Sequence, residues 1–305
     1  NAIQSSHIYS TYFAPRGRSR IYTLGMQIAQ LYLSPFDQII GFIGEAGSGK
    51  SVLIKGMFPG IELTNDDDGV NVRPLPLLEQ EYETGFFTPH TYHLDIRFET
   101  GFHQLSELAD AVRLAVRRGK RIIIEHFDLI YPLLGVNANL LIGVGEQIVI
   151  TRPNLFGPLP QDLCDIVYPS LAYRLMAHSA EDLCEYAMTQ EQMLACSHGD
   201  IRHGFVLEFN EHQPDIDIPT LEARVNELIR ADLPIDYYDE SHILLGGVQH
   251  YCTGPRTHVR STGRIIGFRL LDHFIYDHFH KTYMLVGCVG DDSEENIRKL
   301  EKIHG

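Results

Sequence analysis

The sequence predicts an α/β domain, with a parallel sheet and covering helices, followed by a second domain of different character. Apolar runs alternate with amphipathic segments through the first half of the 305 residues, as in parallel sheets covered by helices. Segment 153–160 then holds three prolines and one glycine, which favours a linker. We therefore expect an N-terminal extension over 1–34, the α/β domain over 35–152, the linker over 153–160, and the second domain over 161–305.

The elements of the first domain follow one another at short intervals. Five apolar residues at 39–43 predict a buried strand, and an amphipathic helix over 51–57 comes after it. Apolar residues at helical spacing, with Gly119 as a stop, predict a later helix over 103–118. The remaining predicted strands cover 92–98, 121–125 and 147–151.

A glycine-rich motif lies between the first strand and the first helix. It fits G-x-x-x-x-G-K-S/T and consists of Gly44, Glu45, Ala46, Gly47, Ser48, Gly49, Lys50 and Ser51. Glycines let backbone N–H groups converge on a phosphate, the lysine reaches the outer phosphates, and the serine hydroxyl can bind Mg²⁺. A turn without a ligand would not need lysine and serine together at a helix start. We expect a nucleotide with Mg²⁺, ATP or GTP.

Two acidic residues, Asp95 and Glu125, lie at or near the ends of predicted strands. The carboxyl edge of an open parallel sheet is where ligands bind, and the glycine-rich loop must lie at the same edge. One carboxylate could position Mg²⁺ and the other the attacking water. The alternative is that both are surface carboxylates without a catalytic role.

The first half resembles TsaE, the P-loop ATPase of the bacterial tRNA threonylcarbamoyladenosine system. The resemblance covers about residues 35–150 and rests on the glycine-rich motif and on the segments 73–82, 93–97 and 122–125. It implies ATP hydrolysis, with Asp95 and Glu125 as metal-binding and catalytic carboxylates. The family's serine- and threonine-rich switch is replaced here by 72–78, which holds two prolines. Its hydroxyl is therefore absent, or displaced to Thr64.

The second half offers four donors for a metal ion. His178 and Asp182 are four residues apart in a helix expected over 168–188, and so share one face. Cys252 and His258 lie far downstream on a glycine- and proline-containing loop. Nitrogen, oxygen and sulfur donors of this kind suit Zn²⁺, with His250 as a substitute ligand. A metal-free site is the alternative.

The second half also resembles the editing domain of alanyl-tRNA synthetases and its free-standing AlaX relatives. Three segments in the family's order carry the resemblance: 178–183, 222–234 and 257–267. It implies an α+β editing-type domain that binds zinc and hydrolyses mischarged aminoacyl-tRNA. Three departures bear on this activity: Asp182 replaces the family's second histidine, Cys252 precedes His258 by six residues instead of four, and Arg264 replaces a glutamate.

The net charge of −15 restricts the partners. Nucleic-acid binding draws much of its affinity from basic surfaces, so any tRNA contact must be local. We expect a basic cluster near the end of the chain to make this contact; it consists of Arg256, Arg260, Arg264 and Arg269. We expect a second cluster near the start to be solvated; it consists of Arg16, Arg18 and Arg20.

Composition sets broader limits. Hydrophobic residues make up 44% of the chain, and no apolar run approaches the roughly 18 residues of a membrane span. Five cysteines without compact spacing argue against a disulfide framework. We therefore expect a cytoplasmic protein that makes no membrane contact.

Three functions remain open from the sequence. The first is an ATPase unit joined to an editing unit that acts on aminoacyl-tRNA or a related ester. The second is an ATP-binding regulator whose editing fold has lost catalysis. The third is a small-molecule kinase, in which Asp95 or Glu125 would deprotonate the acceptor hydroxyl.

Overall fold

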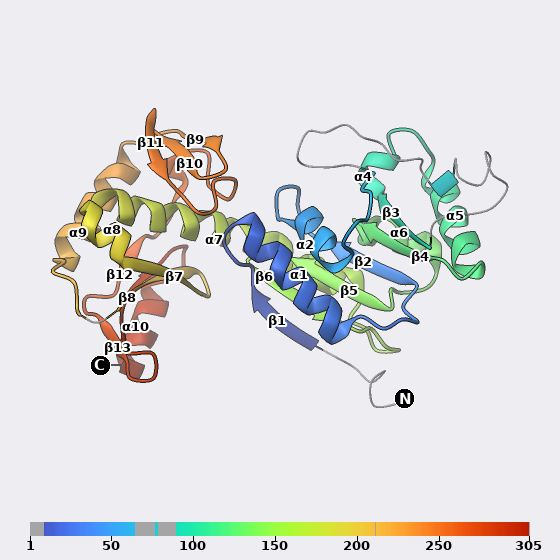
Figure 1. Cartoon of the computed structure of the whole chain (residues 1–305), viewed down its shortest axis with the longest axis horizontal. Helices are drawn as coiled ribbons and strands as arrows, with labels where there is room; N and C mark the ends of the chain where they lie inside the picture. Colours follow the sequence, from blue (N-terminus) through green and yellow to red (C-terminus); the bar gives the residue numbers. More distant parts are fainter. Residues whose placement is uncertain (1–8, 65–76, 79–89, 211, 305) are drawn as a thin grey trace. The chain divides into compact units, whose positions relative to one another are not determined.

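The computed structural model describes residues 9–64, 77–78, 90–210 and 212–304, drawn as ribbon in Figure 1. The chain forms two compact units. Unit 1 contains the chain up to Ala14 and residues 18–170, and unit 2 contains residues 15–17 and 171–305. The division falls inside the helix α7 (Pro160–Ala187) and not at the linker expected over 153–160. Pro160 starts this helix, because a proline in the first turn lacks only an N–H that would have no partner there.

The sheet of unit 1 has six strands in the order β1-β6-β5-β2-β4-β3. Neighbouring strands from β5 to β3 are parallel, whereas β6 is antiparallel to both β5 and β1. The α/β class is confirmed, but the sheet is mixed and not purely parallel. Only Gly145 and Glu146 separate β5 from β6, which allows a hairpin but no crossover. The strands are β1 (Tyr9–Phe13), β2 (Ile39–Ile43), β3 (Thr91–Asp95), β4 (Arg121–Glu125), β5 (Leu140–Val144) and β6 (Gln147–Thr151).

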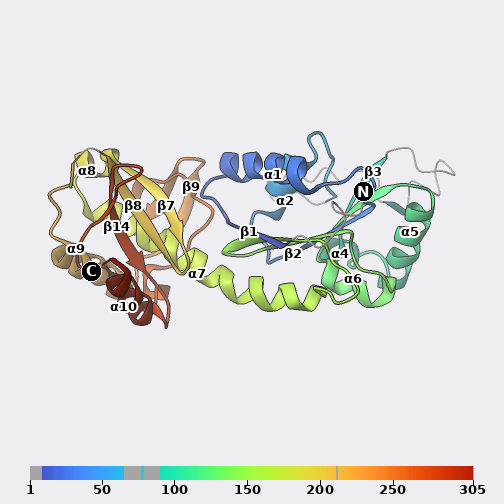
Figure 2. The same cartoon turned by 90° about the horizontal axis from the view of Figure 1, so that it is seen from below.

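Helices cover both faces of this sheet (Figure 2). On one face lie α1 (Arg18–Tyr32) and α2 (Lys50–Met57), and on the other α5 (Leu105–Arg117), α6 (Phe127–Leu134) and the start of α7. The period of two along β4 explains the two cores, because Ile123 packs in one while Ile122 and Ile124 pack in the other. The expected extension 1–34 thus contributes a strand and a covering helix to unit 1.

The strand expected over 92–98 ends early. β3 stops at Asp95, and Ile96–Glu99 forms the short helix α4. The Asp95 carboxylate accepts a hydrogen bond of 3.1 Å from the backbone N–H of Phe98, which makes Asp95 the N-cap of α4. An aspartate of this kind favours the start of a helix over the continuation of a strand.

Unit 2 contains two sheets. One has the order β12-β14-β8-β7, with β13 also paired to β14, and the other has the order β11-β10-β9. Along β8, Phe205 and Leu207 pack with α7 and α9, whereas Val206 lies in a second cluster with residues of α10. The strands are β7 (Cys196–Ile201), β8 (Gly204–Asn210), β9 (Ile235–Asp239), β10 (His242–Leu245), β11 (Val248–Tyr251), β12 (Arg269–Leu270), β13 (Ile275–Asp277) and β14 (Thr282–Cys288).

The helices of unit 2, besides the rest of α7, are α8 (Gln190–Ala195), α9 (Ile218–Arg230) and α10 (Ser293–His304), with a 3-10 turn η1 over Thr262–Arg264. None of the helices in the described parts of either unit has the length and apolar character needed to cross a membrane.

Candidate functional sites

The glycine-rich motif forms the turn between β2 and α2. Gly47 and Gly49 have φ of 78° and 96°, values that favour glycine, and a Cβ at Gly44 would lie 2.5 Å from the Val144 carbonyl oxygen. Gly49, the N-cap residue of α2, has no side chain with which to cap the helix. A helix N-terminus of this kind carries partial positive charge and N–H donors that suit an anion.

The lysine of the motif lies back over its own loop. Lys50 Nζ is 2.8 Å from the carbonyl oxygens of both Gly44 and Glu45. The Lys50 side chain is buried, and its charge contributes to the electrostatics of Glu125 and His126. The cation is therefore held at the mouth of the loop, next to the end of β4.

Both predicted carboxylates lie at the carboxyl edge of the sheet beside this loop. Glu125 pairs in register with Phe42 of β2, one residue before the last of that strand, and Asp95 pairs in register with Glu125. Both side chains are buried. The parallel register therefore brings the loop and the two carboxylates to one edge, although the N-cap bond of Asp95 occupies one of its oxygens.

A histidine that sequence reasoning did not assign holds Glu125 in place. The backbone N–H of Thr64 lies 3.1 Å from His93 Nδ1 and, as an N–H group, can only donate a hydrogen bond. Nδ1 is thus the acceptor, so Nε2 carries the proton and donates to Glu125 Oε2 at 2.7 Å. Burial alone would raise the pKa of Glu125, but the hydrogen bond from His93 and the charge of Lys50 outweigh it and hold that pKa below its usual value.

The residue after Glu125 has an unusual backbone. His126 has φ of 56°, in the left-handed region that is costly for a residue with a Cβ, and it caps α6. Burial, and then the charges of Lys50 and Arg97, lower the pKa of its imidazole. Arg97 also approaches the loop, where it lies 3.5 Å from the Glu45 carboxylate. The expected switch segment 72–78 lies outside the described residues, apart from Leu77 and Leu78.

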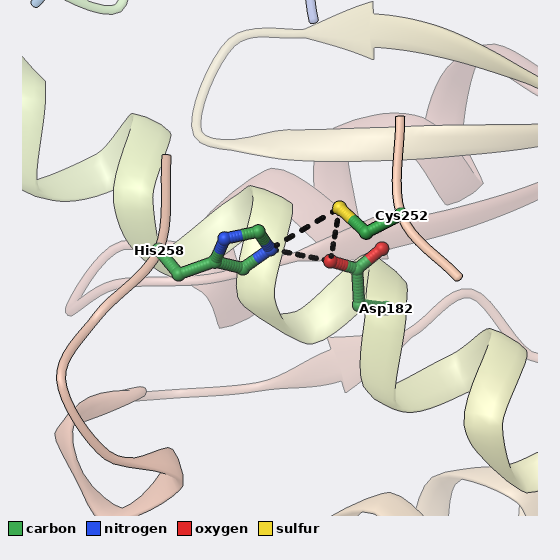
Figure 3. A group of neighbouring side chains, drawn as sticks. All are labelled: Asp182, Cys252 and His258. Carbon is green, nitrogen blue, oxygen red and sulfur yellow. Dashed lines mark hydrogen bonds and ion pairs between the residues drawn. The ribbon is translucent and has the colours of Figure 1, made fainter. Parts of the chain in front are cut away.

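In unit 2, three of the four predicted metal ligands come together. Figure 3 shows the side chains of Asp182, Cys252 and His258 turned toward one another, and one ligating atom from each lies within 4.8 Å of the others. Cys252 Sγ donates to Asp182 at 3.2 Å and lies 3.7 Å from His258 Nε2, which also contacts Asp182. His258 Nδ1 is 3.3 Å from the Pro255 carbonyl oxygen, which can only accept. Nε2 therefore faces the cluster, as in a metal-binding histidine.

The fourth predicted ligand lies apart from this cluster. In the described chain, His178 is in none of the groups whose ligating atoms meet within 4.8 Å, and its Nε2 is 4.0 Å from Asp200 of β7. Burial, followed by the charges of Arg16 and Arg174, lowers the pKa of His178 and keeps it neutral. The helical spacing of four places His178 and Asp182 on one face but does not make their side chains converge.

An arginine occupies the position of the cation in this cluster. Arg16 Nη2 donates to Asp182 at 2.7 Å and to Cys252 Sγ at 3.4 Å, while Nη1 bonds to Glu181. We expected Arg16 to be solvated, but it is only 3% exposed. Gly17 allows this placement, because its φ is 84° and a Cβ there would lie 2.7 Å from the Thr253 carbonyl oxygen. The burial of Arg16 could not be predicted from its own segment, because nearby Arg20 is exposed.

The buried charges of the cluster compensate one another. Burial opposes the charge of Arg16, but the carboxylates of Asp182 and Glu181 outweigh it and raise the pKa of the guanidinium. Against the effect of burial, Arg16 and His258 hold the pKa of Asp182 well below its usual value. Burial raises the pKa of Cys252 to about 12, with Asp182 adding to the effect. The donor types fit zinc, but in this arrangement the ionised carboxylate is already neutralised by Arg16.

The arginines expected to meet tRNA fall into two groups. Arg256 lies 3.1 Å from Glu240, and Arg269 lies 3.2 Å from Glu294, so both take part in surface ion pairs. Arg260 and Arg264 are exposed.

A comparison with protein-family models finds no match, and a comparison with curated proteins finds none either.

Replacing Arg16 tests the charge compensation. We expect Arg16→Ala to lower the free energy of unfolding of unit 2 by about 3–5 kcal/mol, because the buried Asp182 carboxylate loses its partner. Urea unfolding followed by circular dichroism measures this. Arg20→Ala, at an exposed position, is the control and should stay within about 0.5 kcal/mol of the unaltered protein. Equal midpoints for the two variants would contradict the compensation.

The pH dependence of stability tests the protonation of Glu181. Burial raises the pKa of Glu181 to about 8, although Arg16 opposes the shift. The folded state therefore keeps a proton that the unfolded chain has lost, and stability falls as pH rises toward 8. Burial also raises the pKa of Glu185 to about 7, which adds to the loss at the lower end of this range. His178 and His250, whose pKa values burial lowers, act in the opposite direction only below about pH 6.5. We expect a loss of about 2 kcal/mol between pH 6.5 and 8.

Glu181→Gln should remove most of this loss, because glutamine carries no titrating proton. Urea unfolding of both proteins at the two pH values measures the difference. An unchanged pH dependence in the variant would show that Glu181 is already ionised in the folded protein.

Proposed function

We propose that unit 1 binds a magnesium nucleoside triphosphate, with ATP as the expected nucleotide, and hydrolyses it. One observation carries the proposal: the buried cation of Lys50 and the N-terminus of α2 lie at the same sheet edge as Glu125 and Asp95. Lys50 and the N-terminus of α2 are suited to bind phosphate oxygens, and the two carboxylates are suited to bind a metal ion or a water molecule.

The residues of the site divide the work between them. Lys50 Nζ would exchange the carbonyl oxygens of Gly44 and Glu45 for phosphate oxygens, and the backbone N–H groups of 47–51 would surround the same charge. Ser51, at the start of α2, supplies the hydroxyl for magnesium. The ion, when bound, would neutralise charge on the phosphates. The loop thus binds, and the strand ends face the reacting phosphate.

Glu125 is the residue to which we assign the attacking water. Its lowered pKa keeps it ionised near neutral pH, and the His93 N–H fixes one of its oxygens. The other oxygen can accept a hydrogen bond from water and orient it toward the terminal phosphate. His93 is a positioning residue, because it acts through Glu125, and Thr64 in turn fixes the tautomer of His93.

For unit 2, one observation favours a regulatory role over editing. Arg16 bonds to two of the three gathered donors, and its charge opposes a dication at the same place. A zinc-dependent deacylase needs those donors for the ion. The second candidate function is therefore a nucleotide-binding regulator, whose editing-type cluster is closed by a guanidinium.

Nucleotide titration tests the first proposal. We expect the intact chain to bind ATP with Mg²⁺ in titration calorimetry, and Lys50→Ala to weaken binding at least about tenfold through loss of a charged hydrogen bond. Glu125→Gln should keep the affinity but lower the rate of phosphate release by about 10²- to 10⁴-fold. Lys55→Ala, near the other end of α2, is the matched control and should change neither quantity.

Two outcomes would contradict the nucleotide proposal. One is the absence of heat with adenine and guanine triphosphates alike. The other is equal weakening of binding by Lys50→Ala and Lys55→Ala, which would remove the loop from the binding site.

A deacylation assay tests the second candidate. With zinc supplied, we expect the unaltered protein to release no more labelled serine from mischarged tRNA than buffer does, because Arg16 holds the donors. An editing domain of an alanyl-tRNA synthetase serves as the positive control for the substrate. Zinc-dependent release by the unaltered protein would overturn the regulatory reading and restore the editing function.

A further inference from the structure

A second group of metal-binding side chains lies in unit 2, on different residues from the cluster of Figure 3. Glu185 follows Asp182 by three residues on α7, and Cys196 and His198 lie two residues apart on β7. Alternate residues of a strand share one face, so the thiol and the imidazole both point toward α7. One ligating atom from each of the three lies within 4.8 Å of the others.

The distances within this group are close to those of a zinc site. Cys196 Sγ is 3.5 Å from Glu185 Oε1, and His198 Nε2 is 2.8 Å from the same oxygen. Tetrahedral bonds of about 2.0–2.3 Å place neighbouring ligand atoms about 3.3–3.8 Å apart. The sulfur and oxygen are thus already at that separation, and the imidazole would have to move back by about 0.5 Å.

Burial and access also suit an ion. The Glu185 side chain is 6% exposed, while Cys196 and His198 are half-buried. The buried Glu185 carboxylate holds one ligand in a fixed position on α7. Because Cys196 and His198 on β7 are half-buried, an ion can reach them from solvent. Three protein ligands leave the fourth tetrahedral position for water, as in catalytic zinc sites.

The two groups of donors differ in whether an arginine is hydrogen-bonded to them. Arg16 donates to Asp182 and Cys252 of the first cluster, so a guanidinium is already bonded there. In the second group, Cys196 and His198 both contact Glu185, Cys196 also donates to the Met193 carbonyl, and Arg16 acts on Glu185 only through its charge. A dication can replace these contacts without displacing an arginine from its hydrogen bonds.

A spare donor lies beside this second group. His250 has a ring nitrogen within 4.8 Å of carboxylate oxygens of Asp182 and Glu185. Its side chain is buried, and among the described residues its Nε2 has no hydrogen-bond partner. A buried nitrogen of this kind is costly unless it binds a proton donor, a water or a metal ion.

We propose that Glu185, Cys196 and His198 bind a divalent ion of the zinc class, with His250 as an additional donor beside Glu185. Imidazole, thiolate and one carboxylate favour zinc over magnesium or calcium, which prefer oxygen ligands. The site goes beyond the nucleotide function, since it uses no residue of unit 1.

Cobalt substitution tests this site in the full-length chain. The protein is stripped with a chelator and titrated with Co²⁺, whose thiolate charge-transfer absorption reports a cysteine ligand. We expect one equivalent to give that absorption in the unaltered protein and in Cys252→Ser. Cys196→Ser should lose the absorption, and His198→Ala should weaken binding at least about tenfold. Circular dichroism without metal checks that each variant is folded.

If Cys196→Ser does not fold, anomalous diffraction from crystals of the unaltered protein grown with zinc decides the matter. An ion among Glu185, Cys196 and His198 supports the proposal. An ion at Asp182, Cys252 and His258 overturns it, as does loss of the cobalt absorption in Cys252→Ser alone. The proposal is also overturned if the unaltered protein shows no thiolate absorption with Co²⁺. None of these results depends on whether unit 1 binds a nucleotide.

Discussion

The parallel register of β2, β4 and β3 is the constraint on which the site of unit 1 depends. It places Phe42, Glu125 and Asp95 in one row at the carboxyl edge of the sheet, where the loop after β2 must also turn. Because the strands are buried on both faces, a one-residue register shift would move their side chains from one core into the other and disrupt the packing of both. The packing that stabilises the sheet therefore also sets the separation between the cation of Lys50 and the carboxylate of Glu125.

In unit 2 the corresponding constraint is charge balance in a buried volume. The helix α7 carries Glu181, Asp182 and Glu185 into the interior, where ionised carboxylates are unfavourable without partners. Arg16 and His258 neutralise Asp182, while burial raises the pKa of Glu185 to about 7. The same requirement explains why the guanidinium of Arg16 is buried against this face of α7.

The sequence predicted the parts whose signal is local. β2, β4 and β6 have the expected bounds, because short apolar runs specify them. The antiparallel direction of β6 could not be predicted without β5, whose apolar run we did not identify. The burial of Arg16 depends on a contact with residues more than 160 positions away, and so does not appear in the composition of its own segment. His93 was missed because its role depends on pairing of β3 with β4.

The most direct test of the account is a crystal structure of the intact chain with Mg²⁺ and a non-hydrolysable ATP analogue. The account predicts phosphate oxygens within hydrogen-bond distance of the backbone N–H groups of 47–51, with Lys50 Nζ moved from the carbonyl oxygens of Gly44 and Glu45 to the nucleotide. A nucleotide bound elsewhere, with Lys50 still on those two carbonyl oxygens, would contradict it.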